Sequence, residues 1–203
     1  PMLLTGGMYI INKEISIIML GGLGSAEEVG YFRVAQRGAM LIPFAVQALN
    51  MSIAPNVSIL YTNGQIQRLQ QMITKSVRGI LVYVLPVSLV LMFGGFWLIP
   101  FIFGEEYTPA ISPLIILCIG QLINGIMGMG AIMLNMTENE RLAAFGILIA
   151  AIVNIILNIF LIPVWGVIGA AVATSLSIII WNIIHTYWLF KKTGIMIVKL
   201  NLK

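Results

Sequence analysis

Residues 154–175 read NIILNIFLIPVWGVIGAAVATS, two apolar segments that are joined by a short turn without a charged residue. Pro163 and Gly166 favour an end of the first helix and a change of direction, because proline lacks the backbone donor and glycine tolerates unusual dihedral angles. The small residues that follow, beginning with Gly169, allow another helix to approach closely. This stretch therefore predicts a hairpin of two membrane-spanning helices.

Asparagines mark one face of this hairpin. Asn154 and Asn158 lie four residues apart, so a helix places both amides on the same side. An amide that faces lipid lacks hydrogen-bond partners, so this side needs a protein neighbour. Asn124 lies in a similar position within residues 120–128, GQLINGIMG, where small residues recur at helical spacing. We predict that Asn124, Asn154, Asn158 and Gly169 serve helix packing.

The composition of the whole chain agrees with a location in a membrane. Hydrophobic residues make up 60% of its 203 residues and charged residues only 9%, and the mean hydropathy is +1.02. Such a chain has too little polar surface to cover a soluble globule. The sequence starts with Pro1 and soon enters an apolar segment, which suggests a fragment of a longer protein. We predict an all-α, polytopic membrane protein.

Six apolar segments are long enough to cross a hydrocarbon core of about 30 Å, which takes roughly 20 helical residues. They cover residues 3–22, 31–59, 80–103, 111–136, 143–162 and 166–190. We expect them to form a single helical bundle within residues 1–203. The longest connection, residues 61–79, has apolar residues at helical spacing between Gln, Lys and Arg, which predicts an amphipathic cytoplasmic link.

The loop charges predict the orientation of this bundle. If all six segments cross, one side holds basic residues, namely Arg68, Lys75, Arg78, Arg141, Lys191, Lys192, Lys199 and Lys203. The connections on the other side hold acidic residues, namely Glu27, Glu28, Glu105 and Glu106. Basic loops stay in the cytoplasm, so we predict a multi-pass protein of the cell membrane with both ends of this segment inside.

The pattern NxxxNxxLIPxxGxxGAAxAT in residues 154–174 resembles a late hairpin of the polysaccharide flippases, a family of the multidrug/oligosaccharidyl-lipid/polysaccharide exporter superfamily. EVGYFRVA at 28–35 and PNVSILYTNG at 55–64 resemble segments at matching places in that family. The resemblance covers nearly the whole chain and corresponds to the C-terminal half of a transporter with about 12–14 spans.

This resemblance implies a function. Flippases of this kind move a polyprenyl-diphosphate-linked oligosaccharide, the repeat unit of an O-antigen, capsule or exopolysaccharide, across the cell membrane by alternating access. The partners that it implies are this lipid-linked diphosphate, membrane lipids, a polysaccharide polymerase and glycosyltransferases. It implies no cofactor. Exporters of drugs or of peptidoglycan precursors belong to the same superfamily and are the first alternative.

Charges within the first predicted span point to a polar interior. Lys13 and Glu14 lie near the middle of residues 3–22, where one charge costs on the order of 3 kcal/mol on insertion scales. These side chains must therefore face other spans or a water-filled cavity, and a structural ion pair with a neighbouring span is the simpler alternative. The resemblance places an acidic residue here, which makes Glu14 a candidate for coupling to a cation.

Two arginines carry the prediction of a substrate site. Arg33 and Arg37 are four residues apart and share a helix face, with Gln36 and Gln47 within roughly 100° of them on an ideal helix. Two guanidinium groups one turn apart suit a diphosphate, because each offers parallel donors to phosphate oxygens. We predict a substrate cavity that is lined by Arg33, Arg37, Gln47 and Lys13. No acidic residue shares their helix face.

A more ordinary role for the same arginines stays open at the level of sequence. Long basic side chains at the end of a span can reach the outer headgroups, or they can pair with Glu27 or Glu28. Arginine anchors of this kind contribute to the position of a span and bind no substrate. The two roles differ in whether the guanidinium groups line a cavity.

The sequence argues against several other classes. The chain has no Asp, one histidine, His185, and no Gly-x-Ser-x-Gly segment, so a catalytic triad and a metal site are not predicted. A membrane-embedded sugar or acyl transferase would have to use Glu105 with Glu106 or Glu138 with Glu140. A net charge of +4 that is scattered over loops does not indicate a nucleic-acid partner.

Overall fold

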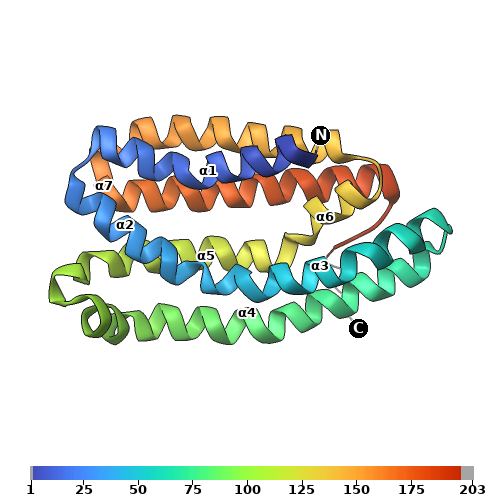
Figure 1. Ribbon diagram of the computed structural model, residues 1–203, viewed down its shortest axis with the longest axis horizontal. Helices are drawn as coiled ribbons and strands as arrows, with labels where there is room; N and C mark the ends of the chain where they lie inside the picture. The colour runs from blue at the N-terminus through green and yellow to red at the C-terminus, as the bar shows by residue number, and fades with distance from the viewer. Residues whose placement is uncertain (1, 198–203) are drawn as a thin grey trace.

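The structure is a computed structural model that describes residues 2–197, without the side chains of residues 2–6, 8–11, 13 and 45. In this part of the chain the secondary structure is helical and contains no strand. Figure 1 shows the helices lying side by side along the long axis, with the chain reversing direction at the two ends of the molecule. The predicted all-α bundle is confirmed.

Eight elements follow one another along the described chain. They are α1 (Met2–Leu23), α2 (Ala26–Ala39), α3 (Leu41–Thr62), α4 (Ile66–Phe103), the 3-10 helix η1 (Glu105–Ala110), α5 (Ile111–Met127), α6 (Met129–Met136) and α7 (Glu140–Thr193). Consecutive pieces such as α2 and α3, or α5 and α6, continue in one direction and act as one rod (Figure 1). The 54-residue α7 instead turns back on itself and supplies two antiparallel arms, residues 140–165 and 167–193.

The turn of α7 is made by one residue. Gly166 has φ 54° and ψ −131°, which a residue with a side chain rarely adopts, whereas Pro163 is still part of the helix. The predicted hairpin is therefore present, but the first arm ends at Gly166 and not at Pro163. A Cβ atom on Gly169 would collide with the carbonyl oxygen of Leu161, so the two arms meet closely at this glycine.

Four helical stretches of the described chain are long and apolar enough to cross a membrane, and α7 is one of them. The stretch in α4 has 38 residues, about 57 Å at 1.5 Å per residue, and thus exceeds a hydrocarbon core of about 30 Å. The link predicted at 61–79 is not a separate helix: residues 66–79 are the first turns of α4. Their apolar face, with Leu69, Ile73 and Val77 buried, packs within the protein and not on a lipid surface.

Two spans are interrupted near the middle of the molecule. α2 ends at Ala39, and Pro43 explains why: proline has no N–H group with which to bond the carbonyl of Ala39, four residues earlier. A proline inside a helix favours a bend or a break, but α3 and α4 continue through Pro55 and Pro86. The second interruption separates α5 from α6 at Gly128.

The helices form two layers around a shared interior. α1 packs against both arms of α7, and the α2–α3 rod, α4 and α5 lie in the other layer (Figure 1). α5 contacts both α7 and α4 and so joins the layers. The outer surface is strongly apolar: Phe101 is 89% exposed and Trp97 77% exposed. Side chains of this kind belong in lipid, as the composition predicts.

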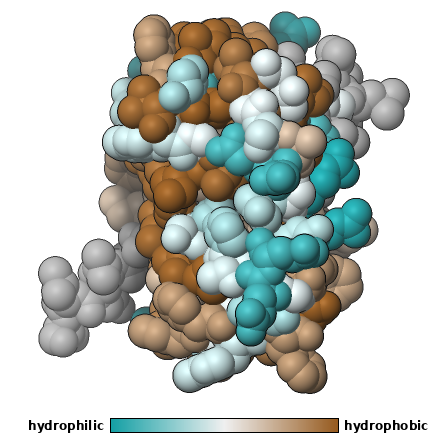
Figure 2. All heavy atoms as spheres, turned by 90° about the vertical axis from the view of Figure 1, so that its left-hand side faces the viewer, coloured by the Kyte–Doolittle hydropathy of each residue, from teal (hydrophilic) through white to brown (hydrophobic). Residues whose placement is uncertain are grey.

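Charges separate between the two ends of the bundle. The end with the turn after α1, with η1 and with Gly166 holds Glu27, Glu28, Glu105 and Glu106, and we call it the acidic end. The opposite end, the basic end, holds Arg68, Arg141, Lys191 and Lys192, with Lys75 and Arg78 further along α4. Lys199 and Lys203 lie outside the described residues. Figure 2 shows the acidic end, where hydrophilic side chains gather in a band beside apolar ones.

Glu28 joins two helices at the acidic end. One carboxylate oxygen, Oε2, accepts a hydrogen bond from the backbone N–H of Ser25 at 3.0 Å, while the Ser25 hydroxyl accepts one from the N–H of Glu28. The other oxygen, Oε1, accepts from the N–H of Val167 at 3.1 Å, at the start of the second arm of α7. A carboxylate is favourable at a helix N-terminus, and the carboxylate of Glu28 accepts hydrogen bonds at the starts of two helical segments, α2 and the second arm of α7.

We therefore expect Glu28→Ala to lower the free energy of unfolding by about 1–2 kcal/mol, the usual range for the loss of an N-terminal cap. Thermal unfolding of the purified protein in detergent measures the change. Glu27→Ala is the matched control, because Glu27 is exposed in the same helical turn and its carboxylate caps neither helix. Equal melting temperatures for the two variants would show that the Glu28 link contributes nothing.

Candidate transport site

Three adjoining cavities run along the inner face of α2 and α3. The first, the arginine cavity, has a volume of about 290 Å³ and is lined by Glu14, Ile17, Arg33, Gln36, Arg37 and Met40. The second, the central cavity, has about 280 Å³ and shares Gln36 and Met40 with the first. The third, the asparagine cavity, has about 200 Å³ and shares Pro43, Gln47 and Trp181 with the second. The three cavities therefore lie next to one another in a row.

The arginine cavity brings together the charged residues that the sequence singled out. Arg33 and Arg37 lie one turn apart on α2 with exposed side chains, and Glu14 reaches the same cavity from α1. The arginines thus have an acidic neighbour on another helix, which helical spacing within α2 does not reveal. Among the described side chains, no nitrogen–oxygen distance within 4.0 Å joins Glu14 to either arginine. The side chain of Lys13 lies outside the described part.

Pairing of the arginines with the loop acids is not observed. The carboxylate of Glu28 is bonded to the backbone of Ser25 and Val167, as described above. Both arginines line a cavity, and both side chains are exposed.

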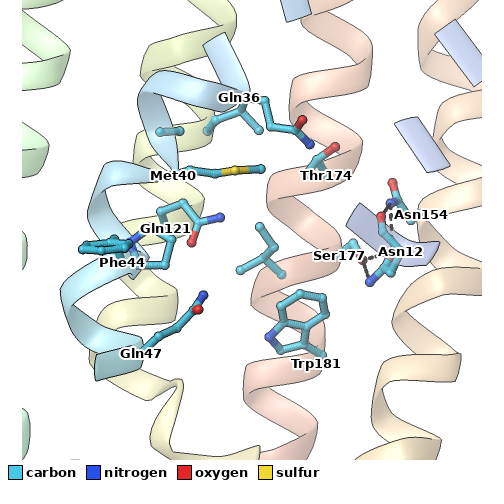
Figure 3. Close-up of a pocket in the computed structure, with 14 residues that line it drawn as sticks. Asn12, Gln36, Met40, Phe44, Gln47, Gln121, Asn154, Thr174, Ser177 and Trp181 are labelled. Carbon is cyan, nitrogen blue, oxygen red and sulfur yellow. Dashed lines mark hydrogen bonds between the residues drawn. The ribbon is translucent and has the colours of Figure 1, made fainter. Parts of the chain in front are cut away.

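Several amide side chains line the central cavity, between apolar residues. Figure 3 shows Gln36 and Gln47 on the α2–α3 rod, Gln121 on α5, and Thr174 and Trp181 on the second arm of α7 around the same space. Gln47 lines the central cavity and the asparagine cavity, and not the arginine cavity. Gln36, which belongs to both the arginine cavity and the central cavity, connects these two.

A buried hydrogen-bond network forms the wall of the central cavity next to α1. The Nδ2 atom of Asn154 donates to Oδ1 of Asn12 at 3.0 Å, and Nδ2 of Asn158 donates to Oγ of Ser16 at 3.1 Å. The hydroxyls of Ser16 and Thr174 are 2.7 Å apart. α1 and both arms of α7 are thus tied together by neutral groups.

Two of the four predicted packing residues, Asn154 and Asn158, belong to this network, with one difference between them. Asn158 is fully buried and donates to Asn154 and Ser16, whereas Asn154 also lines the central cavity. Asn12 and Ser16 were missed as partners. They are four residues apart on α1, the same spacing as the two asparagines of α7, and this repeated spacing was the available signal.

Asn124 occupies the contact between α5 and α7. Its Oδ1 atom accepts a hydrogen bond from Nδ2 of Asn182 at 3.0 Å, and its own Nδ2 donates to Gln121 at 3.1 Å. One turn earlier, Gly120 lies so close to Ser175 that a Cβ atom would meet it at 2.9 Å. Asn124 also lines the asparagine cavity, together with Asn182. Helix packing and cavity lining are therefore combined in the same residues.

The arrangement can bind a polar ligand with an anionic part and a neutral part. Guanidinium groups lie at one end of the row, and amides, hydroxyls and an indole ring follow. Within the described residues, no group of three or more His, Cys, Asp or Glu side chains is placed to hold a metal ion.

Proteins with related sequences are known from archaea. The chain is 28% identical over 184 residues to the probable low-salt glycan biosynthesis flippase Agl15 of Haloferax volcanii, covering 91% of this chain and 39% of that protein. It is 31% identical over 176 residues to the probable flippase AglR of the same organism, covering 84% of this chain and 36% of that protein. The chain therefore spans less than half the length of these relatives.

Solved structures share the fold. A MOP superfamily transporter from Pyrococcus furiosus, described as having a binding pocket of reverse polarity, superposes with a TM-score of 0.80 at 20% identity, over 98% of this chain and 45% of that one. A multidrug resistance MATE family transporter in its outward-facing conformation also gives a TM-score of 0.80, at 21% identity, over 98% of this chain and 45% of that one.

A family model provides the assignment. The model described as MatE matches residues 1–160, which contain α1 to α6 and most of the first arm of α7. The flippase relatives and the shared transporter fold agree with this match. The chain belongs to the MatE family.

Proposed function

We propose that this chain forms one half of a transporter that moves a polyprenyl-diphosphate-linked oligosaccharide across the cell membrane by alternating access. The observation that carries the proposal is the position of Arg33 and Arg37, one turn apart, in a cavity that adjoins a second cavity with several amides in its lining. The names of the relatives, two probable flippases, support a lipid-linked substrate. Flipping of such a lipid in reconstituted vesicles, with and without the two arginines, tests the proposal.

The chemistry of the arginine cavity favours a diphosphate. A guanidinium group stays charged at all relevant pH values and binds phosphate oxygens through parallel N–H donors. Arg33 and Arg37 provide two guanidinium groups in a cavity of about 290 Å³. The same cavity contains one carboxylate, that of Glu14. The balance of charge at this end of the row therefore favours an anion. In this proposal the carboxylate of Glu14 binds a coupling cation in the same step.

A second candidate is an exporter of cationic drugs, which the likeness to a multidrug resistance transporter suggests. Glu14 is the acidic residue on which such a site would depend. The two arginines disfavour it, because a drug cation would have to bind beside two like charges. A transferase that used Glu105 with Glu106, or Glu138 with Glu140, would work outside the three cavities, since none of these glutamates lines them.

The charge difference between the ends of the bundle supports an orientation with the basic end in the cytoplasm. We expect a cysteine at Asn63, in the turn between α3 and α4, or at Asn139, before α7, to react only with thiol reagents that enter the cytoplasm. A cysteine at Thr108, which is exposed in η1, should react with impermeant reagents from outside. Labelling of position 63 from outside would reverse the orientation.

A further inference from the structure

We infer that the central cavity and the asparagine cavity together form a subsite for an uncharged sugar, the one next to the diphosphate of the substrate. This inference rests on the proposed function, which assigns the diphosphate to the arginine cavity. The order of the three cavities matches the order of the groups in such a lipid: the diphosphate lies in the first, and the sugar extends into the second and third.

The described lining of these two cavities is uncharged apart from the titratable ring of His185. It contains no Asp, Glu, Lys or Arg among the described side chains, in contrast to the arginine cavity. A neutral site avoids the desolvation of unpaired charges and suits a ligand part that is itself neutral. The boundary between charged and neutral lining falls at Gln36, which belongs to both the arginine and the central cavity.

The amides of the central cavity are suited to hydroxyl groups. Each amide has both a donor and an acceptor, as a hydroxyl does, so the two can exchange hydrogen bonds in either direction. Gln47 on α3 and Gln121 on α5 lie on one side of the space shown in Figure 3, and the indole of Trp181 lies across from them. An aromatic face beside polar amides can pack against the C–H groups of a sugar ring.

The asparagine cavity adds a more specific requirement. His185 is 1% exposed, and its Nε2 atom lies 2.9 Å from the carbonyl oxygen of Ala143. A carbonyl can only accept, so Nε2 carries the proton, and Nδ1 of the neutral ring is an acceptor. This Nδ1 atom has no hydrogen-bond partner among the described residues, and the same holds for Oδ1 of Asn50, which is 7% exposed. Both residues line the asparagine cavity.

Oδ1 of Asn50 and Nδ1 of His185 are buried acceptors without a partner among the described residues, so a ligand part that donates hydrogen bonds would complement them. A sugar hydroxyl is a donor, whereas the oxygens of an ionised diphosphate only accept. The cavity that holds Asn50 and His185 therefore suits the sugar part of the substrate and not its phosphates. Volumes of about 280 and about 200 Å³ bring the two cavities together into the range of roughly 300–1,000 Å³ that small-ligand sites occupy. This is room for a small part of an oligosaccharide.

The test compares two probes of equal charge that differ only in the sugar. The first is a polyprenyl diphosphate that carries one neutral hexose, and the second is the methyl ester of the same polyprenyl diphosphate. Equilibrium binding of both to the full-length protein is measured in lipid nanodiscs. We expect Gln47→Leu and Asn50→Leu each to weaken binding of the hexose probe by about tenfold, which corresponds to one lost polar contact, and to leave the methyl ester unaffected.

Matched controls separate the possible results. Gln71→Leu makes the same exchange on an exposed position of α4 outside the three cavities and should change neither probe. Gln47 is itself exposed, so its variant should fold even if the buried Asn50→Leu variant does not. A wild-type protein that binds both probes equally, or a Gln47→Leu variant that keeps the wild-type preference, overturns the sugar subsite alone. Failure of the wild type to bind either probe rejects the proposed function itself.

Discussion

Replacing Arg33 or Arg37 by glutamine in the full-length protein is expected to stop formation of the polymer, with the lipid-linked repeat unit accumulating on the cytoplasmic side. Both side chains line the arginine cavity, and both are exposed, so glutamine should leave the folded state and the amount of protein in the membrane near normal. Hydrogen bonds to a charged group contribute about 1.5–3 kcal/mol each, which corresponds to a loss of roughly tenfold to over a hundredfold in affinity.

Lysine substitutions at the same positions test whether the site requires only a positive charge or also the planar donor geometry of a guanidinium group. Arg33→Lys and Arg37→Lys keep a positive charge but lose the two-pronged donor geometry, so we expect partial activity. Arg141→Gln is the matched control, because Arg141 is exposed at the basic end and lines none of the three cavities. Polymer length and amount, with membrane abundance measured in parallel, give the result. If both glutamine variants make polymer at the normal rate, the arginines are headgroup anchors.

Replacing Asn158 by leucine should act on the fold and not on the site. Its Nδ2 atom donates to Ser16 at 3.1 Å and to Oδ1 and the backbone oxygen of Asn154 at 2.8 and 2.9 Å, and the side chain is fully buried. The bond to Ser16 ties the first arm of α7 to α1. A bond between helices in a membrane contributes about 0.6–2 kcal/mol, and the abandoned partners add to the loss.

We therefore expect Asn158→Leu to lower the free energy of unfolding by about 1–3 kcal/mol and to reduce the folded protein in the membrane, while transport per remaining molecule changes little. Unfolding in detergent mixtures and surface abundance measure this. Asn56→Leu, on an exposed position of α3, is the control. Asn154 is less suitable because it also lines the central cavity. Normal stability together with lost transport would place Asn158 in the site.

The sequence predicts local features of this fold well. The periodicity and length of the apolar segments locate the helices. Gly166 indicates the hairpin, because glycine readily adopts the positive φ that the turn requires. Pro163 misleads, since a proline near the end of an apolar arm can remain in the helix when the turn that follows is made elsewhere. The same holds for Pro55 and Pro86, whose helices continue.

The site is less predictable because it depends on how helices face each other. Helical spacing shows that Arg33 and Arg37 share a face, but the rotation of α1 that brings Glu14 to them follows from packing across the whole bundle. The partners Asn12 and Asn154 are separated by 142 residues, and no local pattern pairs them. Spacing within one helix thus predicts which residues share a face. The packing of the neighbouring helices determines which partners these residues meet.

In the proposed function the full-length protein moves a diphosphate-linked sugar lipid by means of the arginine cavity. The most direct measurement is the initial rate at which a polyprenyl-diphosphate oligosaccharide changes leaflets in liposomes that contain the purified protein. We predict a rate well above that of protein-free liposomes, and one at least tenfold lower for Arg33→Gln together with Arg37→Gln. A wild-type rate equal to that of protein-free liposomes, or a double variant as fast as the wild type, would contradict the account.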